Sequence, residues 1–254
     1  MSKDGFFQEI EHTAVPWRQR QLYVPVFYQD VMSLSVSFLA PMERVKAILP
    51  STRMKPYRVS PWHSIVSITA YKYRDSDIGP YNEISIAVPI TLDRETPLFT
   101  GTIRRMPQVP KLYVRHLPVT TEIAREVGVE FAGYPKFLAE IDFVEEGDWV
   151  SCALKAENKH VLTLKGRKLE LQQFSRFRAH PITYRRGFLL RSEIVVNERD
   201  MGISKNAGDT EIHLGEHPIA EELKDIKLGR VLAYQYCPQY QIILTPVFES
   251  YAAG

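Results

Sequence analysis

The chain has 254 residues, of which 44% are hydrophobic and 24% are charged, a balance typical of folded rather than disordered proteins. Its formal net charge of +2 is too small to indicate nucleic acid or a membrane surface as a partner. No apolar run approaches the roughly 20 residues that cross a bilayer, and the first residues do not resemble a signal peptide. Because Cys152 and Cys237 are far apart, we expect two packed free thiols in a reduced, cytoplasmic protein.

Segments with a period of two dominate the chain, and we expect each of them to form a strand. They cover residues 33–40, 64–73, 83–92, 111–119, 136–146, 149–158, 160–171, 187–197, 230–237 and 240–248. Clusters of Gly, Pro and Asp or Asn between these segments are typical of turns. The chain is therefore expected to be rich in β-structure.

Three short segments show helical patterns instead. Residues 41–50 begin and end with proline, residues 120–133 offer Thr120 or Thr121 as an N-cap, and residues 217–226 place a proline in the first turn. About ten strands and three short helices predict a β-rich α+β fold of curved antiparallel sheets or a β-barrel. Because the sequence contains no repeat and no linker, we expect a single domain over residues 1–254.

Two patterns that look chemical favour ordinary structure. His213 and His217 have the spacing of a metal-binding pair, but Gly215 and Pro218 disfavour the helix that would aim both at one ion, so we expect a polar turn and no metal. The basic run at residues 176–186 lacks a nucleic-acid recognition motif, and we expect it to form a solvated face. The sequence also lacks a nucleotide-binding loop and the Gly-x-Ser-x-Gly motif of common serine hydrolases.

Lys136 follows Gly-Tyr-Pro at the start of an alternating apolar run. A lysine has a pKa near ~10.4 in water and is almost entirely protonated at pH 7, whereas burial among apolar groups favours the neutral, nucleophilic amine. Pro135 restricts the backbone that leads into Lys136. The residues alone leave two interpretations open: a nucleophile in a pocket, or a lysine at a strand end with its ammonium group in water.

The segment GVEFAGYPKFLAEI resembles the signature of the acetoacetate decarboxylase family, in which Gly-Tyr/Phe-Pro-Lys carries a lysine that forms a Schiff base. The match covers Gly128, Glu130 and residues 133–136. A second match covers Tyr81 and Glu83 in GPYNEISIAVPI, and weaker likeness extends over most of the chain. The resemblance implies a barrel-like fold, homo-oligomers, a small keto acid as substrate, and no metal or organic cofactor.

The resemblance also implies roles for individual residues. Lys136 would be the nucleophile, and Glu83 would transfer protons or orient the substrate. Tyr81, Tyr134 and Phe137 would lie at the substrate. Glu130 matches the motif without a catalytic role, and we expect it to form a structural ion pair or a cap.

The sequence departs from the family pattern at three places. Phe137 stands where the decarboxylase has a second lysine, Val129 stands where the motif has an arginine, and residues 27–38 lack the arginine that helps to hold the substrate carboxylate. Other groups, such as Arg104, Arg105 or Arg115, could replace that last arginine. The departures leave open decarboxylation of a β-keto acid, aldol and dehydration chemistry on a pyruvate-like substrate, and a non-catalytic barrel that binds a small keto compound.

Overall fold

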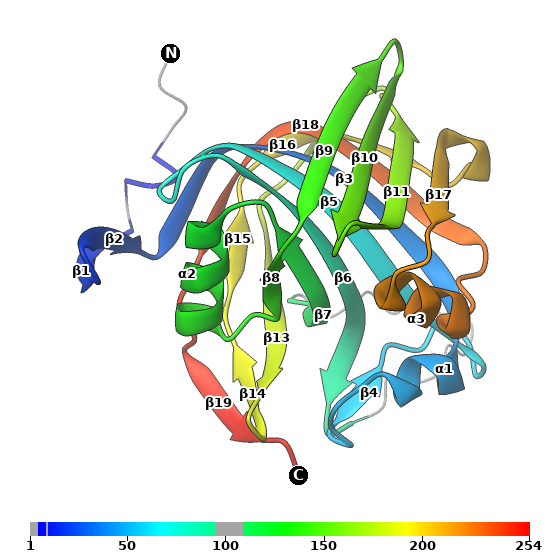
Figure 1. Ribbon diagram of the computed structural model, residues 1–254, viewed down its shortest axis with the longest axis horizontal. Coiled ribbons are helices and arrows are strands. Elements are labelled where there is room, and N and C mark those ends of the chain that lie inside the picture. Colours follow the sequence, from blue (N-terminus) through cyan, green and yellow to red (C-terminus); the bar gives the residue numbers. More distant parts are fainter. Residues whose placement is uncertain (1–4, 9, 95–108) are drawn as a thin grey trace.

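The computed structural model describes residues 5–8, 10–94 and 109–254, and its centre is a closed β-barrel (Figure 1). Seven strands pair in the order β18–β3–β5–β6–β7–β13–β15, and β15 pairs back onto β18. Their bounds are β3 Val26–Pro41, β5 His63–Ser76, β6 Tyr81–Leu92, β7 Lys111–Val119, β13 Phe177–Arg185, β15 Ile194–Val196 and β18 Val231–Leu244. All neighbours are antiparallel except β7 and β13. The expected β-rich barrel fold is confirmed.

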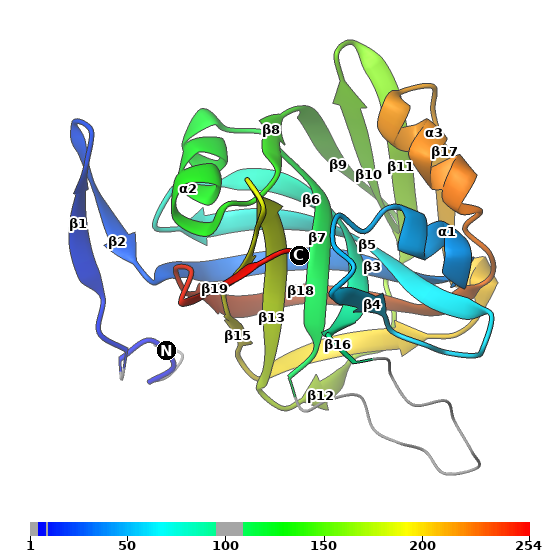
Figure 2. The ribbon, with the colours of Figure 1, turned by 90° about the horizontal axis from the view of Figure 1, so that it is seen from below.

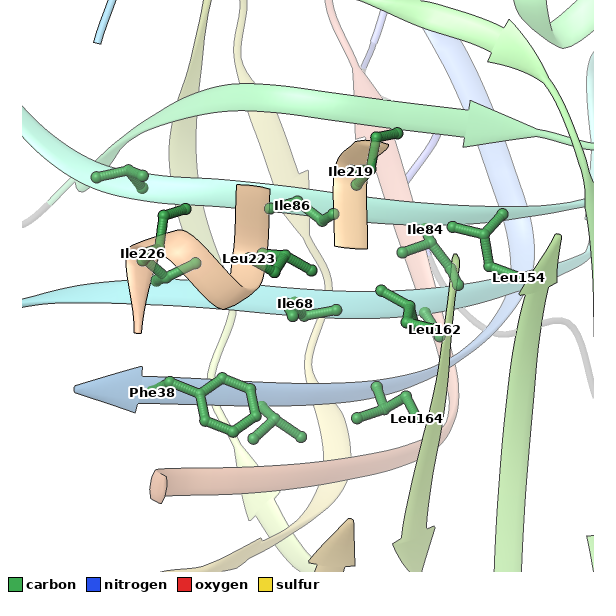
Figure 3. Packing of buried hydrophobic residues seen from close by; sticks show 14 of the residues in the cluster. Phe38, Ile68, Ile84, Ile86, Leu154, Leu162, Leu164, Ile219, Leu223 and Ile226 are labelled. Carbon is green, nitrogen blue, oxygen red and sulfur yellow. The ribbon is translucent and has the colours of Figure 1, made fainter. Parts of the chain in front are cut away.

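A second sheet covers the outer face of β3, β5 and β6. Its strand order is β17–β11–β10–β9, with bounds β17 Thr210–Leu214, β11 Lys159–Arg167, β10 Trp149–Ala156 and β9 Glu140–Glu146. Helices α1 (Met42–Ala47) and α3 (Pro218–Ile226) pack on the same face, and Leu223 of α3 lies over Ile68 and Ile86 (Figure 3). Because side chains alternate along a strand, the apolar residues of β3, β5 and β6 point into this core and their polar partners point into the barrel.

The remaining elements extend the barrel at its edges. Strands β1 (Thr13–Trp17) and β2 (Arg20–Val24) form a hairpin that projects from the body, as Figure 2 shows. Helix α2 (Glu122–Ala132) leads into β8 (Lys136–Leu138), which pairs in parallel with β7. The other short elements are β4 Met54–Pro56, β12 Gln172–Phe174, β14 Phe188–Arg191, β16 Arg199–Ser204, β19 Glu249–Ala252 and a 3₁₀ turn at Ala207–Asp209.

The described residues form 19 strands, more than the ten or so expected from the sequence. One reason is that residues 136–146 and 187–197 each divide into two strands, whereas the last two expected strands merge into β18. The expected solvated face at residues 176–186 is wrong, because this run forms β13, a strand of the barrel. Phe177, Ala179 and Pro181 line the cavity and Arg178 between them is exposed, so the charges obscured an alternating pattern.

The structure also tests what the sequence predicted for the helices, the cysteines and the two histidines. The three expected helices are present, and Thr121 is the N-cap of α2. Both cysteines are free and buried. His213 is an exposed residue of β17, and His217 caps α3 by accepting a hydrogen bond from the Ile219 N–H at 3.2 Å. The described ranges contain no cluster of side chains suited to a metal ion, and none of their helices is long and apolar enough to cross a membrane.

Candidate active site

Lys136 and Glu83 form a buried ion pair at the wall of the barrel. Lys136 Nζ lies 2.7 Å from Glu83 Oε2, and the two side chains are only 4% and 7% exposed. Glu83 comes from β6, where it pairs in register with Tyr71, and Lys136 is the first residue of β8, beside Leu117 of β7. The fold therefore brings together the two residues that the sequence identified as candidates.

The backbone before Lys136 makes two sharp changes of direction. Gly133 ends α2 in the left-handed region, with φ 62°, and a Cβ atom there would lie 2.4 Å from Leu190 Cδ1. The Tyr134 N–H then donates to the Gly128 carbonyl at 3.0 Å, and the Lys136 N–H donates to the Tyr134 carbonyl at 2.8 Å. The second bond spans a three-residue turn centred on a proline, which fixes the start of β8. This turn directs the Lys136 side chain across α2.

Gly128 provides the space through which the Lys136 side chain passes. A Cβ atom at Gly128 would lie 2.4 Å from Lys136 Cδ and 2.6 Å from Cε, far inside van der Waals contact. The motif therefore needs a glycine at position 128 for a steric reason, because any larger residue there would displace the Lys136 amine.

We expect Gly128→Ala to lower the rate of adduct formation at Lys136 by about a hundredfold, because a shift of about 1 Å in a reacting group has effects of that order. The fold should survive, since the displaced atoms are the flexible end of a lysine and alanine favours a helix over glycine by about 1 kcal/mol. Stopped-flow measurement of imine formation with a keto acid, beside a thermal unfolding curve, tests this. Val129→Ala on the same helix is the matched control, and equal rates for the two variants would contradict the steric argument.

Tyrosines surround the ion pair. The Tyr73 hydroxyl donates to Glu83 Oε1 at 3.0 Å, and burial, followed by the nearby Glu83 charge, raises the pKa of Tyr73 well above its ordinary value. Tyr73 therefore remains a protonated donor to the carboxylate. Lys136 Nζ lies 5.4 Å from the centre of the Tyr81 ring and 5.8 Å from that of Tyr134, within range of cation–π attraction.

A cavity of about 280 Å³ adjoins the pair inside the barrel. One side of it is rich in hydroxyl groups from β3, β5 and β6, whereas β7, β13 and β15 contribute mainly apolar side chains. Its lining includes three residues that carry a charge, Lys136, Glu83 and Arg199. The site combines an amine, a carboxylate in contact with it, and space for an organic molecule.

The structure brings the predicted substrate residues together only in part. Tyr134 lines the cavity, and its hydroxyl lies 3.0 Å from Ser192 Oγ. Tyr81 is buried beside the ion pair, and its hydroxyl donates to Tyr28 at 3.2 Å. Phe137 lies apart from both, packed against the core outside the barrel, because adjacent residues on a strand point to opposite faces.

Two other sequence candidates have partners elsewhere. Glu130 accepts a hydrogen bond from Trp17 Nε1 at 2.6 Å and pairs with Arg18, so it ties the N-terminal hairpin to α2. Arg115 forms an ion pair with Glu222 of α3, with Nη2 and Oε2 2.7 Å apart. Arg115 is therefore directed away from the cavity.

Arg104 and Arg105 lie outside the described residues. Arg199, which the sequence reasoning missed, is an arginine that lines the cavity. No motif surrounds Arg199 in the sequence, and its position follows only from the pairing of β16 with β18.

Fold and site together define a β-barrel protein with an internal small-molecule cavity and a buried lysine at its wall. The family model described as acetoacetate decarboxylase (ADC) matches residues 12–247, and the chain belongs to this family. No curated protein matches the sequence significantly.

Several solved structures share the fold at low sequence identity. The acetoacetate decarboxylase of Legionella pneumophila is similar with a TM-score of 0.64 and 14% identity, over 89% of this chain and 88% of that one. The enduracididine biosynthesis enzyme MppR, complexed with pyruvate, gives a TM-score of 0.64 and 10% identity over 95% and 98%. An acetoacetate decarboxylase-like enzyme from Sphingomonas wittichii gives 0.56 and 16% over 90% and 94%.

Proposed function

We propose that the protein is a Schiff-base-forming lyase that acts on a keto acid, with Lys136 as the nucleophile and Glu83 as the acid–base group. The contact between the Lys136 amine and the Glu83 carboxylate at the cavity wall carries this proposal. Membership of the acetoacetate decarboxylase family supports it. Tyr81 and Tyr134 would support the lysine, while Phe137 would act only through packing.

The chemistry begins when the ammonium of Lys136 passes a proton to Glu83, which is within direct reach. The neutral amine attacks the carbonyl carbon, a C–N bond forms, and the carbonyl oxygen leaves as water after protonation. The resulting iminium accepts the electron pair of a breaking C–C or C–H bond and becomes an enamine. Protonation at carbon and hydrolysis then release the ketone and restore the amine.

Decarboxylation of a β-keto acid and aldol chemistry both use this iminium. A specific observation favours the second as a rival: among the described residues, the arginine that lines the cavity is Arg199, and it comes from β16 rather than from the strands that carry Lys136 and Glu83. A carboxylate that leaves as CO2 beside Lys136 would therefore lack an arginine clamp from those strands. A structure of MppR carries the condensation product of pyruvate and imidazole 4-carboxaldehyde, which gives the aldol alternative a precedent in this fold.

Exchange of α-hydrogens tests the proposal without assuming a product. A ketone that forms the iminium loses an α-proton to give the enamine and regains a deuteron in D2O. Proton NMR with acetone, acetoacetate and pyruvate should show enzyme-dependent deuteration, and the same spectra report any decarboxylation. A folded protein that exchanges none of them at any pH tested would instead be a non-catalytic binding barrel.

A further inference from the structure

Arg199 lines the same cavity as the lysine–carboxylate pair but is held by other elements. It is the first residue of β16, and its Cζ lies 4.8 Å from the centre of the Phe177 ring. Nη1 donates a hydrogen bond to the Ser175 carbonyl at 3.5 Å. In residues 5–8, 10–94 and 109–254, no carboxylate lies within ion-pair distance of this guanidinium.

Arg199 is half-buried on the cavity wall, and partial removal of a guanidinium from water costs free energy that a partner anion normally offsets. Burial lowers the pKa of Arg199, as expected for a guanidinium whose charge is not balanced by a nearby carboxylate. The planar fork of arginine matches the two oxygens of a carboxylate. A carboxylate that enters the cavity would therefore meet in Arg199 a cation that forms no ion pair with a described residue.

The pairing of strands places Arg199 across the barrel from Glu83. The backbone carbonyl of Asp200, next to Arg199, accepts a hydrogen bond from Cys237 Sγ at 3.4 Å, which holds β16 against β18. Cys237 pairs with Ser33, Ser33 with Tyr71, and Tyr71 with Glu83. With the step from β16 to β18, four steps between strands separate Arg199 from Glu83, and at roughly 4.8 Å each they give about 19 Å along the wall.

The wall between the two charged sites is lined with hydroxyl groups. Ser33 and Tyr71 lie in the row that joins Cys237 to Glu83, and the next row adds Ser35, Thr69 and Ser85 to the cavity lining. The hydroxyls of Ser35 and Thr69 lie 2.8 Å apart, and one such bond leaves a further donor and acceptors free. The small side chains leave the barrel open here, where bulky residues usually fill a barrel of this size.

We propose that Arg199 binds a carboxylate at the far end of the substrate, so that the enzyme takes keto acids whose carboxylate is several carbons from the reacting carbonyl. The keto group meets Lys136, the spacer crosses the hydroxyl-lined wall, and the carboxylate reaches Arg199. This inference rests on the proposed function of Lys136 and names the class of substrate for that site. In this scheme the carboxylate that Arg199 binds is a different group from any carboxylate that leaves as CO2 beside Lys136.

A series of methyl ketones with a terminal carboxylate measures this spacing. The probes are acetoacetate, 4-oxopentanoate, 5-oxohexanoate, 6-oxoheptanoate and 7-oxooctanoate, each beside its uncharged methyl ester. Borohydride delivers hydride to the iminium carbon and fixes the adduct as a secondary amine, which intact-mass spectrometry quantifies. Half-saturating concentrations for adduct formation are compared between wild type, Arg199→Gln, Arg199→Lys and the control Arg178→Gln, an exposed residue of β13.

The wild type is expected to prefer a longer carboxylate over acetoacetate and over its own ester by about ten- to a hundredfold, the worth of charged hydrogen bonds. Arg199→Gln should remove the preference for the carboxylate and leave the esters unchanged, Arg199→Lys should restore part of it, and Arg178→Gln should behave as wild type. Equal binding of acids and esters at every length, or tightest binding of acetoacetate, would overturn the assignment.

The two proposals fail in different ways. Adducts on Lys136 from esters and acids alike, with no effect of Arg199→Gln, would leave the Schiff base intact and refute the distal anchor. If no probe forms an adduct, calorimetric binding of the same series to Lys136→Ala tests Arg199 without covalent chemistry. A carboxylate preference that depends on Arg199 would then support the anchor, and its absence would refute it.

Discussion

Replacing Lys136 by alanine is expected to abolish enzyme-dependent deuteration of keto acids, with a fall of about a thousandfold or more, because Lys136 is the one lysine that lines the cavity among the described residues. Lys136→Arg is the sharper variant. Arginine keeps a positive charge beside Glu83 but does not lose its proton in proteins, so it cannot attack a carbonyl. Loss of activity in both variants, with folding preserved in the arginine variant, would identify the amine as a nucleophile rather than a simple charge.

The control for this prediction is Lys155→Ala, which removes an exposed lysine of β10 far from the cavity lining. We expect it to match the wild type in the exchange measurement. Substantial exchange by Lys136→Arg would contradict the proposed mechanism, because the reaction would then need only a cation at this position.

Glu83→Gln is expected to have the second largest effect. The amide keeps the size of the side chain and an oxygen that accepts from Tyr73, but it cannot take up the proton of the amine. Proton transfer by a positioned group contributes about 10² to 10⁴ in rate, so turnover should fall by that factor. Single-turnover exchange measurements should show slow formation of the adduct on Lys136 rather than its absence. An unchanged rate would assign Glu83 a structural role.

The same variant tests the energetics of the buried pair. Removing one partner of a buried ion pair typically costs about 3–5 kcal/mol, whereas replacing both by neutral groups of similar volume is often tolerated. Glu83→Gln should therefore unfold at lower urea concentration than Lys136→Met/Glu83→Gln. Glu222→Gln, outside the cavity, is the matched control for activity.

Much of this architecture could be predicted from the sequence because alternation of polar and apolar residues is a local signal. The segment SLSVSFLA shows both faces of β3: Leu34 and Val36 point to the outer core, and the serines between them point to the cavity. The alternation in β13 was equally present but obscured by Arg178 and by Pro181, which is tolerated where the strand lies beside parallel β7.

In the candidate site, too, local signals could be recognised in the sequence, whereas contacts between distant segments could not. Lys136 and Glu83 are far apart in the chain, and only the family resemblance linked them before the structure placed their charged atoms in contact. The steric role of Gly128 depends on the path of one side chain over α2, which no local pattern contains. Arg199 could not be found from sequence, since its relation to the cavity follows from how β16 crosses β18.

Borohydride trapping followed by peptide mapping tests the central claim most directly. Protein incubated with acetoacetate, pyruvate or acetopyruvate and then reduced should gain the mass of the reduced keto acid, or of its decarboxylated ketone, on the peptide that contains Lys136. Lys136→Ala should gain nothing under the same conditions. Adducts spread over exposed lysines, or none in a folded protein across several pH values, would contradict the Schiff-base account.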